Sequence, residues 1–282
     1  MVHIKFNSFL IFTLVTVLID SLFSQPFYNN IKSAELNGIG GQTVAHTSIE
    51  SYAGNPSVLA NLLFSSISIN GENKFSGSGI LGTNIFAGIK ISESSGFGIN
   101  YEYYGITAYH QSVFKAGYGM KLSKRLSLGA SGSFIGFNNV QRESTSLGAF
   151  NMGSQYQLLD NLLIGISFHQ SIINSSFKTQ YLHSTALAGL AYKISSLVTL
   201  FTEVERQENF GANCKVGFQY QITTDFNIGA GINSSPSSFS TGIGYLLQDR
   251  LKLDATFSFY QSIGLTPSFS LRYFLKSKQI AE

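Results

Sequence analysis

The chain has 282 residues, of which 12% are charged, with a net charge of +3 and a single cysteine, Cys214. This length suits one large β domain or two small ones, and the charged fraction is about half that of a typical soluble protein. One cysteine excludes an intrachain disulfide, and the small, dispersed net charge argues against a nucleic-acid partner. Low charge, 28 glycines and 13% aromatic residues fit strands that face lipid on one side.

An export signal is predicted at residues 1–24. His3 and Lys5 form a weakly basic start, residues 9–19 form an apolar core of signal-peptide length, and Ser24 is a small residue before the expected cleavage point. A transmembrane anchor is the alternative reading, but the apolar run is short for a spanning helix and polar residues follow at once. We therefore favour export with removal of the signal.

Residues 25–62 form a segment that does not alternate well between apolar and polar positions. It contains Gly40-Gly41, Asn55-Pro56 and a short helical turn expected at 58–62. We expect it to plug the structure formed by the rest of the chain, or to cap its mouth. The glycines at 38–41 lack the Lys-Ser/Thr and the strand–helix context of a phosphate loop, so no nucleotide site is expected.

Regular alternation, the mark of β-strands with one apolar and one wet face, takes over after residue 62. Two less regular strands are expected near 63–70 and 80–91. Clearer ones follow at 97–104, 112–122, 126–136, 147–158, 162–169, 182–194, 197–206, 210–222, 226–233, 239–247, 251–260 and 268–275. The pattern therefore predicts about 14 strands.

The connections between these strands also alternate. Tight turns are expected at 93–94, 123–125, 160–161, 195–196, 223–225 and 248–250. Looser polar connections are expected at 71–78, 105–111, 137–146, 170–181, 207–209, 234–238 and 261–267. Short turns at one end and longer loops at the other are typical of a bacterial outer-membrane barrel, whose short turns are periplasmic. An even strand count then places both chain ends in the periplasm.

The predicted fold is an all-β transmembrane antiparallel barrel at 63–275, with the 25–62 segment as its plug or hatch and a periplasmic tail at 276–282. Lipid cannot satisfy backbone N–H and C=O groups, so a spanning sheet must close on itself. About 14 strands enclose a lumen wider than side chains alone would fill. The strand at 251–260 should turn its apolar residues to lipid and its charges to the lumen: Leu251, Leu253, Phe257 and Phe259 outward, Lys252 and Asp254 inward.

Several charged residues fall on the inward face of these strands. Lys115, Lys215, Glu203 and Arg272 lie well inside their strands and are the lumen-lining candidates. Two interpretations stay open. The charges pair with one another and with the plug in a sealed lumen, or they form a selectivity lining for a solute.

Apolar and small residues also fall on the inward face. Phe86, Tyr104, Leu187 and Phe201 either line a hydrophobic pocket or pack on the plug. Inward glycines such as Gly129 make room for something in the lumen, for which a plug is a simpler explanation than a ligand.

The 25–62 segment carries a family resemblance. Residues 36–45, LNGIGGQTVA, and 55–60, NPSVLA, resemble the opening motifs of PorV/PorQ-type proteins, roughly MGGAxVA and NPAxLA, with Ser57 replacing an alanine. That family is similar in turn to FadL-type fatty-acid transporters, which are 14-stranded barrels with an N-terminal segment inside. The resemblance makes Gly40, Gly41, Asn55 and Pro56 a plug motif.

Three functions from different classes follow. The resemblance implies an accessory or scaffold component of type IX protein secretion or cell-surface attachment in Bacteroidetes. Its partners would be membrane lipid and secretion-system proteins or a secreted cargo protein. The alternative is a FadL-like channel for uptake of small hydrophobic molecules. An outer-membrane enzyme is weakly supported.

The case for an enzyme rests on little. Ser167 and His169 share an inward face, but serine is so common here that the pairing carries little weight. The histidines show no metal-binding spacing and no G-x-S-x-G motif is present. We therefore expect no enzymatic activity, no catalytic residue, no metal and no cofactor, and a location in the bacterial outer membrane.

Overall fold

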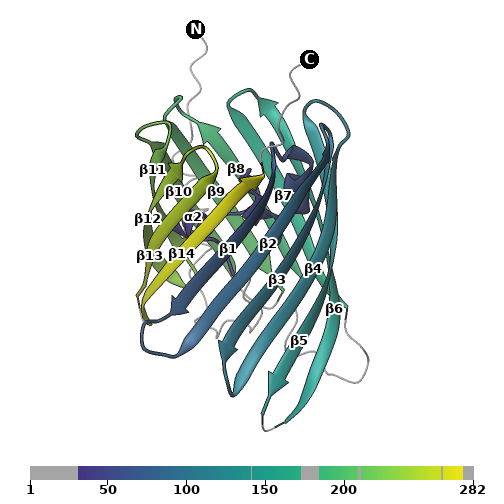
Figure 1. Ribbon diagram of the computed structural model, residues 1–282, viewed down its shortest axis with the longest axis vertical. Helices are drawn as coiled ribbons and strands as arrows, with labels where there is room; N and C mark the ends of the chain where they lie inside the picture. Colours follow the sequence, from purple (N-terminus) through teal and green to yellow (C-terminus); the bar gives the residue numbers. More distant parts are fainter. Residues whose placement is uncertain (1–30, 141, 173–183, 209–210, 262, 276–282) are drawn as a thin grey trace, which may run out of the picture.

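Fourteen strands form one closed antiparallel barrel (Figure 1) in a computed structural model that describes residues 31–140, 142–172, 184–208, 211–261 and 263–275. The strands are β1 (Ser65–Lys74), β2 (Ile80–Ser92), β3 (Ser95–Ile106), β4 (Tyr109–Lys121), β5 (Leu126–Asn139), β6 (Arg142–Leu159), β7 (Leu162–Ile172), β8 (Thr185–Lys193), β9 (Val198–Gln207), β10 (Ala212–Gln221), β11 (Phe226–Ser234), β12 (Ser237–Leu247), β13 (Leu251–Tyr260) and β14 (Gly264–Leu275). Each pairs with its neighbours in sequence, and β1 pairs with β14 to close the wall. The predicted signal at 1–24 and tail at 276–282 lie outside the described residues.

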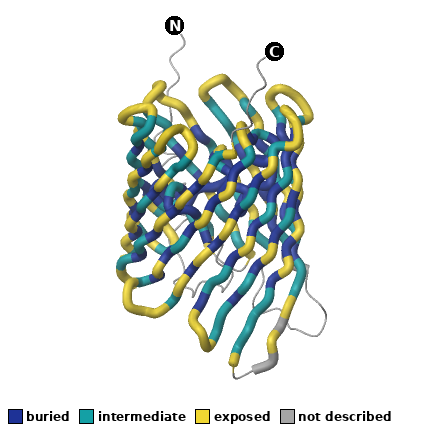
Figure 2. The backbone as a smooth tube through the Cα atoms, viewed as in Figure 1, coloured by how far each residue is buried: buried dark blue, intermediate teal, exposed yellow. Residues whose placement is uncertain are grey.

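The two faces of each strand differ as the alternation predicts. On β13, Phe257 and Phe259 are 46% and 51% exposed, whereas Asp254 and Ser258 are 5% and 6% exposed. Figure 2 shows the same exchange of exposed and buried positions along the wall. An apolar outer face with a polar inner face is the arrangement of a transmembrane barrel. The predicted fold class is therefore confirmed.

Among the described residues, no helix is both long enough and apolar enough to cross a bilayer.

The lengths of the connections agree with prediction at one end of the barrel only. The six expected tight turns all lie at the end where β1 begins and β14 ends, here called the tight-turn end. The expected loose connections lie at the opposite end, between the strands predicted, but most are shorter than expected: β3 ends at Ile106 and β4 begins at Tyr109, with Ile106 paired to Tyr109. Backbone pairing continues there after the apolar alternation stops, because alternation marks only the part of a strand whose faces meet different surroundings. The expected loop at 170–181 lies largely outside the described residues.

Residues 31–62, here called the luminal segment, run inside the barrel (Figure 1). They form α2 (Ala34–Gly38) and two short 3-10 helices, η1 (Ile49–Ala53) and η2 (Pro56–Asn61). The α2 helix contacts β11 to β14, while η2 contacts β2 to β6. The segment therefore reaches across the lumen from one wall to the other.

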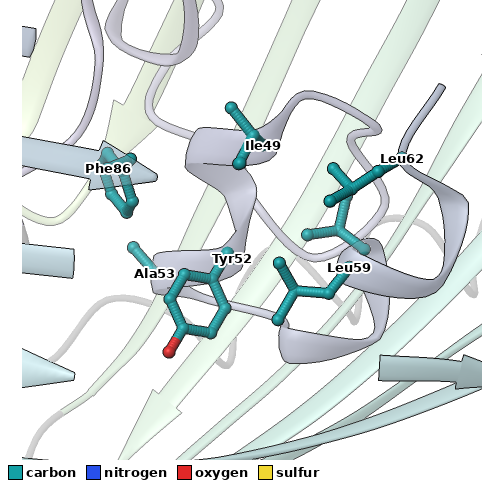
Figure 3. Packing of buried hydrophobic residues seen from close by; sticks show 7 residues of the cluster. Ile49, Tyr52, Ala53, Leu59, Leu62 and Phe86 are labelled. Atoms are coloured by element: carbon teal, nitrogen blue, oxygen red, sulfur yellow. The ribbon is translucent and has the colours of Figure 1, made fainter. Parts of the chain in front are cut away.

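Two apolar clusters hold the luminal segment to the inner wall. Figure 3 shows the first, in which Tyr52 and Leu59 of the segment meet Phe86 of β2, with the Tyr52 and Phe86 rings edge to face at 6.4 Å. In the second, Val44 packs with Phe201 of β9. Phe86 and Phe201 thus pack on the segment, which was one of their two predicted roles.

Candidate functional site

Glycines on the inner wall let the luminal segment touch the backbone of the barrel. A Cβ on Gly129 would lie 2.3 Å from the carbonyl carbon of Pro56, and one on Gly217 would lie 2.1 Å from the Ile39 oxygen. Glycine in a strand often marks such a close approach by another backbone. The backbone of the segment therefore contacts the backbone of the wall directly at these glycines.

The two glycines of the plug motif form a turn after α2. Gly40 and Gly41 have φ angles of +83° and +72°, which favour glycine. The Gly40 N–H donates to Ser240 Oγ at 3.2 Å, and the Gly41 N–H donates to Leu36 O at 2.7 Å. Both glycines are buried, so this part of the motif shapes the segment against β12.

Asn55 and Pro56, the other half of the motif, start η2. The Asn55 side chain accepts from the Ser57 N–H at 3.1 Å, as a helix N-cap does, and Pro56 takes the first position of the helix. The Asn55 amide also donates to Val44 O at 2.7 Å and to Ser154 O of β6 at 3.1 Å. One side chain thus joins the helix, the segment and the wall.

Glu203 and Lys215 form a buried anchor on β9 and β10. Lys215 Nζ lies 2.6 Å from Glu203 Oε1 and 2.7 Å from Glu205 Oε2. Glu203 Oε2 accepts from the backbone N–H groups of Thr43 and Val44 at 2.7 and 2.8 Å. Charge-assisted bonds of this kind are stronger than neutral ones. The anchor therefore holds the middle of the luminal segment.

Lys32 of the segment lies close to this anchor. Its Nζ donates to Gly41 O at 2.5 Å. Burial, together with the nearby Lys215 ammonium, lowers the pKa of Lys32 to about 8.

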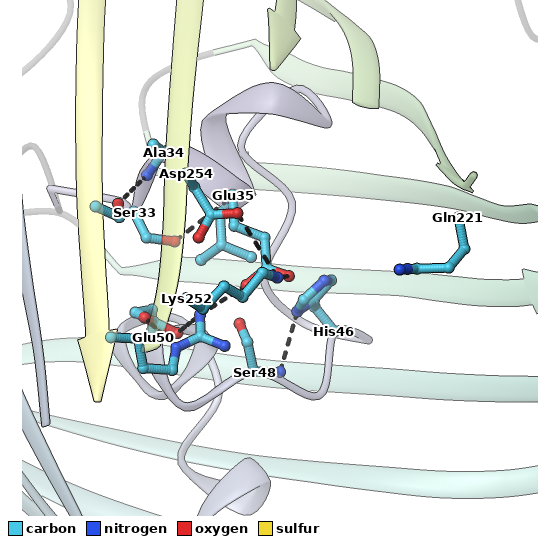
Figure 4. Close-up of polar contacts among 12 residues, drawn as sticks. Ser33, Ala34, Glu35, His46, Ser48, Glu50, Gln221, Lys252 and Asp254 are labelled. Atoms are coloured by element: carbon cyan, nitrogen blue, oxygen red, sulfur yellow. Dashed lines mark hydrogen bonds and ion pairs between the residues drawn. The ribbon is translucent and has the colours of Figure 1, made fainter. Parts of the chain in front are cut away.

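Arg272 joins the segment to β14 in a second anchor, and Figure 4 labels its neighbours Glu35, Glu50 and Lys252. Its Nε donates to Glu50 Oε1 at 2.7 Å, and its Nη2 donates to Glu35 Oε2 at 2.6 Å and also to Glu50 Oε2. Lys252 of β13 pairs with Glu35 and lies 3.6 Å from Asp254. Burial opposes the charge on Glu35, but Lys252 and Arg272 outweigh it and hold the pKa of that carboxyl well below its usual range.

Lys115 of β4 makes the third anchor. Its Nζ donates to Ala53 O at 2.9 Å and lies 6.0 Å from the centroid of the Tyr52 ring. All four lumen-lining candidates are thus inward-facing and buried, and each has a bonded partner. The four are spread over three anchors and do not meet at one point.

Sequence reasoning missed the groups on the segment that complete these anchors. Glu35 and Glu50 stand in a stretch without clear periodicity, and the backbone groups of Thr43, Val44 and Ala53 carry no sequence signal. The signal that could have found the two acids is their presence in a segment otherwise poor in charge.

Ser167, which was considered with His169 as an enzymatic pair, makes hydrogen bonds within the structure. Its Oγ lies 2.7 Å from both Gly54 O and Asn151 Oδ1. In the described part of the chain, no three His, Cys, Asp or Glu residues gather in a way that could hold a metal ion.

The luminal segment divides the lumen into two cavities. A cavity of about 890 Å³ opens toward the end opposite the tight turns, and its lining includes Lys32, Lys74, Tyr104, Leu187 and Glu205. A cavity of about 630 Å³ lies at the tight-turn end, and its lining includes His46, Leu62, Phe201, Leu246 and Arg272. No described residue lines both. The two cavities therefore lie on opposite sides of the luminal segment.

An apolar patch faces the lumen on β4, β5 and β6. Val113, Ile135 and Ala149 form its centre, with Phe137 and Leu147 packed against them. Val113 shares its strand face with Lys115, which points inward, and the three central residues are buried. Asn151, which follows Ala149 on the same face of β6, lines the larger cavity.

These features define a transmembrane β-barrel crossed internally by its own N-terminal segment. Solved structures with this fold include the CymD monoaromatic hydrocarbon channel, with a TM-score of 0.69, 11% identity and coverage of 87% of this chain and 98% of that one. A Pseudomonas aeruginosa FadL homologue has a TM-score of 0.69 at 10% identity, over 89% of this chain and 100% of that one.

The Ralstonia pickettii toluene transporter TbuX has a TM-score of 0.66 at 9% identity, over 86% of this chain and 98% of that one. These likenesses show a FadL-like barrel fold. No family model and no curated protein matches the sequence.

Proposed function

We propose that this protein is an outer-membrane channel for small hydrophobic molecules. The observation that carries the proposal is the apolar surface of the inner wall, which comprises Tyr104, Ile106 and Leu187 in the lining of the larger cavity and the buried apolar patch around Val113, Ile135 and Ala149. A water-filled porin lumen is polar, so an apolar patch inside a barrel favours an apolar solute. The titles of the similar barrels, which name monoaromatic hydrocarbons and toluene, support the same class of solute.

The bonding of the charged residues in the lumen also supports an apolar solute. An ion or sugar pore uses charged side chains that face its solute. Here Lys115 and Arg272 bond to the luminal segment, and Lys215 is paired with Glu203 and Glu205. These charges hold the segment, which is the first of their two predicted roles, and we propose that selection rests on apolar contacts.

We propose that the tight-turn end and both chain ends face the periplasm. The protein should then fractionate with the outer membrane and run faster on a denaturing gel before heating than after, because a closed barrel resists unfolding by detergent. Membrane fractionation with unheated gels checks this. Recovery from the soluble periplasm would contradict it.

Transport is tested in cells that lack a channel of this kind. Cells producing the protein should take up radiolabelled toluene several times faster than cells carrying an empty vector, because the outer leaflet of lipopolysaccharide slows apolar solutes. Uptake is measured over seconds at a toluene concentration below saturation.

A matched variant places charge on the apolar patch. Ile135→Lys should reduce the uptake toward the empty-vector rate. The control is Phe134→Lys, which places the same charge one residue away on the exposed outer face. It shows how much of the effect comes from impaired folding of a strand that carries a charge. Equal uptake by the wild type and by Ile135→Lys, both folded on unheated gels, would contradict the proposed function.

A secretion-accessory role is a second proposal, favoured by the plug motif at Gly40, Gly41, Asn55 and Pro56. The motif is buried, so a secretion partner would bind elsewhere on the barrel. Pull-down from native membranes separates the two proposals. Stable co-purification with secretion components, without toluene uptake, would favour the accessory role.

A further inference from the structure

We infer that the tight-turn cavity is a second binding site, which takes a small apolar molecule carrying one hydrogen-bond acceptor. The inference rests on the proposed function, since it names a site for the same class of solute on the far side of the luminal segment. The cavity of about 630 Å³ falls in the size range of small-molecule sites.

The lining of this cavity is mainly apolar and comes from both the segment and the wall. Ile49 and Leu62 contribute from the segment, and Leu163, Phe201 and Leu246 contribute from β7, β9 and β12. Ligand sites of this kind combine apolar walls with a few placed polar groups. Charged residues line both cavities, including Lys32, Lys74 and Glu205 in the larger one and Glu35, Lys193, Asp249 and Arg272 in this one.

Exposed apolar residues also line this cavity near the tight turns, beside polar ones such as Asn161, Lys193 and Asp249. Leu63, which joins η2 to β1, is 78% exposed, and Phe64 beside it is also exposed. Both residues line the cavity.

His46 supplies the polar group that would orient such a molecule. Its Nδ1 accepts from the Ser48 N–H at 3.1 Å, and its ring lies against Phe201 with centroids 5.2 Å apart. Burial lowers the pKa of His46, so the ring is neutral at neutral pH. In the neutral ring the second nitrogen, Nε2, then carries the hydrogen. Because His46 lines the cavity, Nε2 can donate to an acceptor on the bound molecule.

Two of the charged groups in the same lining are already occupied within the second anchor. Glu35 and Arg272 bond to each other, and both also bond within the anchor described above. The His46 ring, which lies against Phe201, places a donor beside the apolar part of the lining. A carbonyl-bearing aromatic molecule matches this arrangement better than a plain hydrocarbon does.

Crystals of the full barrel soaked with 4-bromoacetophenone test the site directly. We expect an anomalous bromine peak between Phe201 and Leu246, and binding in lipid nanodiscs measured by calorimetry. Leu246→Trp, which places a larger ring in the lining where the bromine peak is expected, should weaken binding at least about tenfold. Leu253→Trp makes the same exchange on the lipid-facing side of the next strand and should leave binding unchanged. Thr199→Phe fills the cavity from β9 should Leu246→Trp fail to fold.

His46→Phe separates the acceptor from the apolar contacts. Losing one neutral hydrogen bond should weaken 4-bromoacetophenone about 2- to 10-fold and leave 4-bromotoluene unchanged. Bromine only in the larger cavity, with toluene uptake intact, would overturn the second site and leave the proposed function standing. Absence of both uptake and bound probe would overturn both.

Discussion

Arg272→Met should lower the free energy of unfolding by about 3–5 kcal/mol, the usual cost of removing one partner from a buried ion pair. Arg272 and Lys252 lie directly opposite each other on β14 and β13, so two like charges face the same space. Glu35 and Glu50 enter between them from the luminal segment. Without Arg272, Glu50 stays fully buried but loses its ion-pair partner.

The chain has no tryptophan, so unfolding in urea is best followed by loss of the fast-migrating species on unheated gels. Arg206→Met is the matched control, because Arg206 is exposed on β9, and it should change stability by no more than about 0.5 kcal/mol. Adding Glu50→Gln to Arg272→Met should recover part of the loss by removing the unpaired acid. Wild-type stability in Arg272→Met would show that this anchor does not hold the segment.

Gly129→Val should displace η2 and open the lumen. The new Cβ would lie 2.3 and 2.4 Å from the Pro56 carbonyl carbon and oxygen and 2.4 Å from the Ser57 nitrogen, all of them backbone atoms. Overpacking of this kind costs about 1–3 kcal/mol. Each 1.4 kcal/mol lost from docking raises the displaced population about tenfold. We expect ion conductance in planar bilayers to rise by that order.

Gly132→Val is the control for this prediction. It lies on the same strand, and nothing stands within 4 Å of the position its Cβ would take. The control should conduct like the wild type and show the same heat-modifiable band. Equal conductance in Gly129→Val and Gly132→Val would mean that the segment does not close the lumen at η2.

The wall of the barrel could be predicted from sequence because lipid and lumen impose opposite demands on adjacent residues. At 251–260 the predicted outward residues Leu253, Phe257 and Phe259 are exposed and the predicted inward Asp254 is buried. The strand ends opposite the tight turns could not be predicted, because both faces of those ends meet water. There β3 and β4 stay paired as far as Ile106 and Tyr109 without any alternation to mark them.

Only the wall residues of the anchors could be predicted from the sequence, and their partners on the segment could not. Alternation places Lys115, Glu203, Lys215 and Arg272 on the inner face, but it cannot name partners that lie far away in sequence. Glu203 bonds to two backbone N–H groups and Lys115 bonds to a backbone oxygen, which no side-chain pattern reveals. The inward glycines carried more information, since Gly129 and its counterparts predicted that something approaches the wall closely.

The seam between β1 and β14 has a consequence for how the protein is assembled. It pairs Ser65 with Leu275, so the whole barrel sequence lies between the two partners. Pairings between residues so distant in sequence are slow to form. The luminal segment precedes β1, so it is made first and must already lie within the curling sheet when the seam closes. The side chain that fastens its two acidic residues belongs to β14, the last strand made. The Arg272 anchor of the luminal segment therefore forms only when the last strand arrives, after the strands that carry the other two anchors.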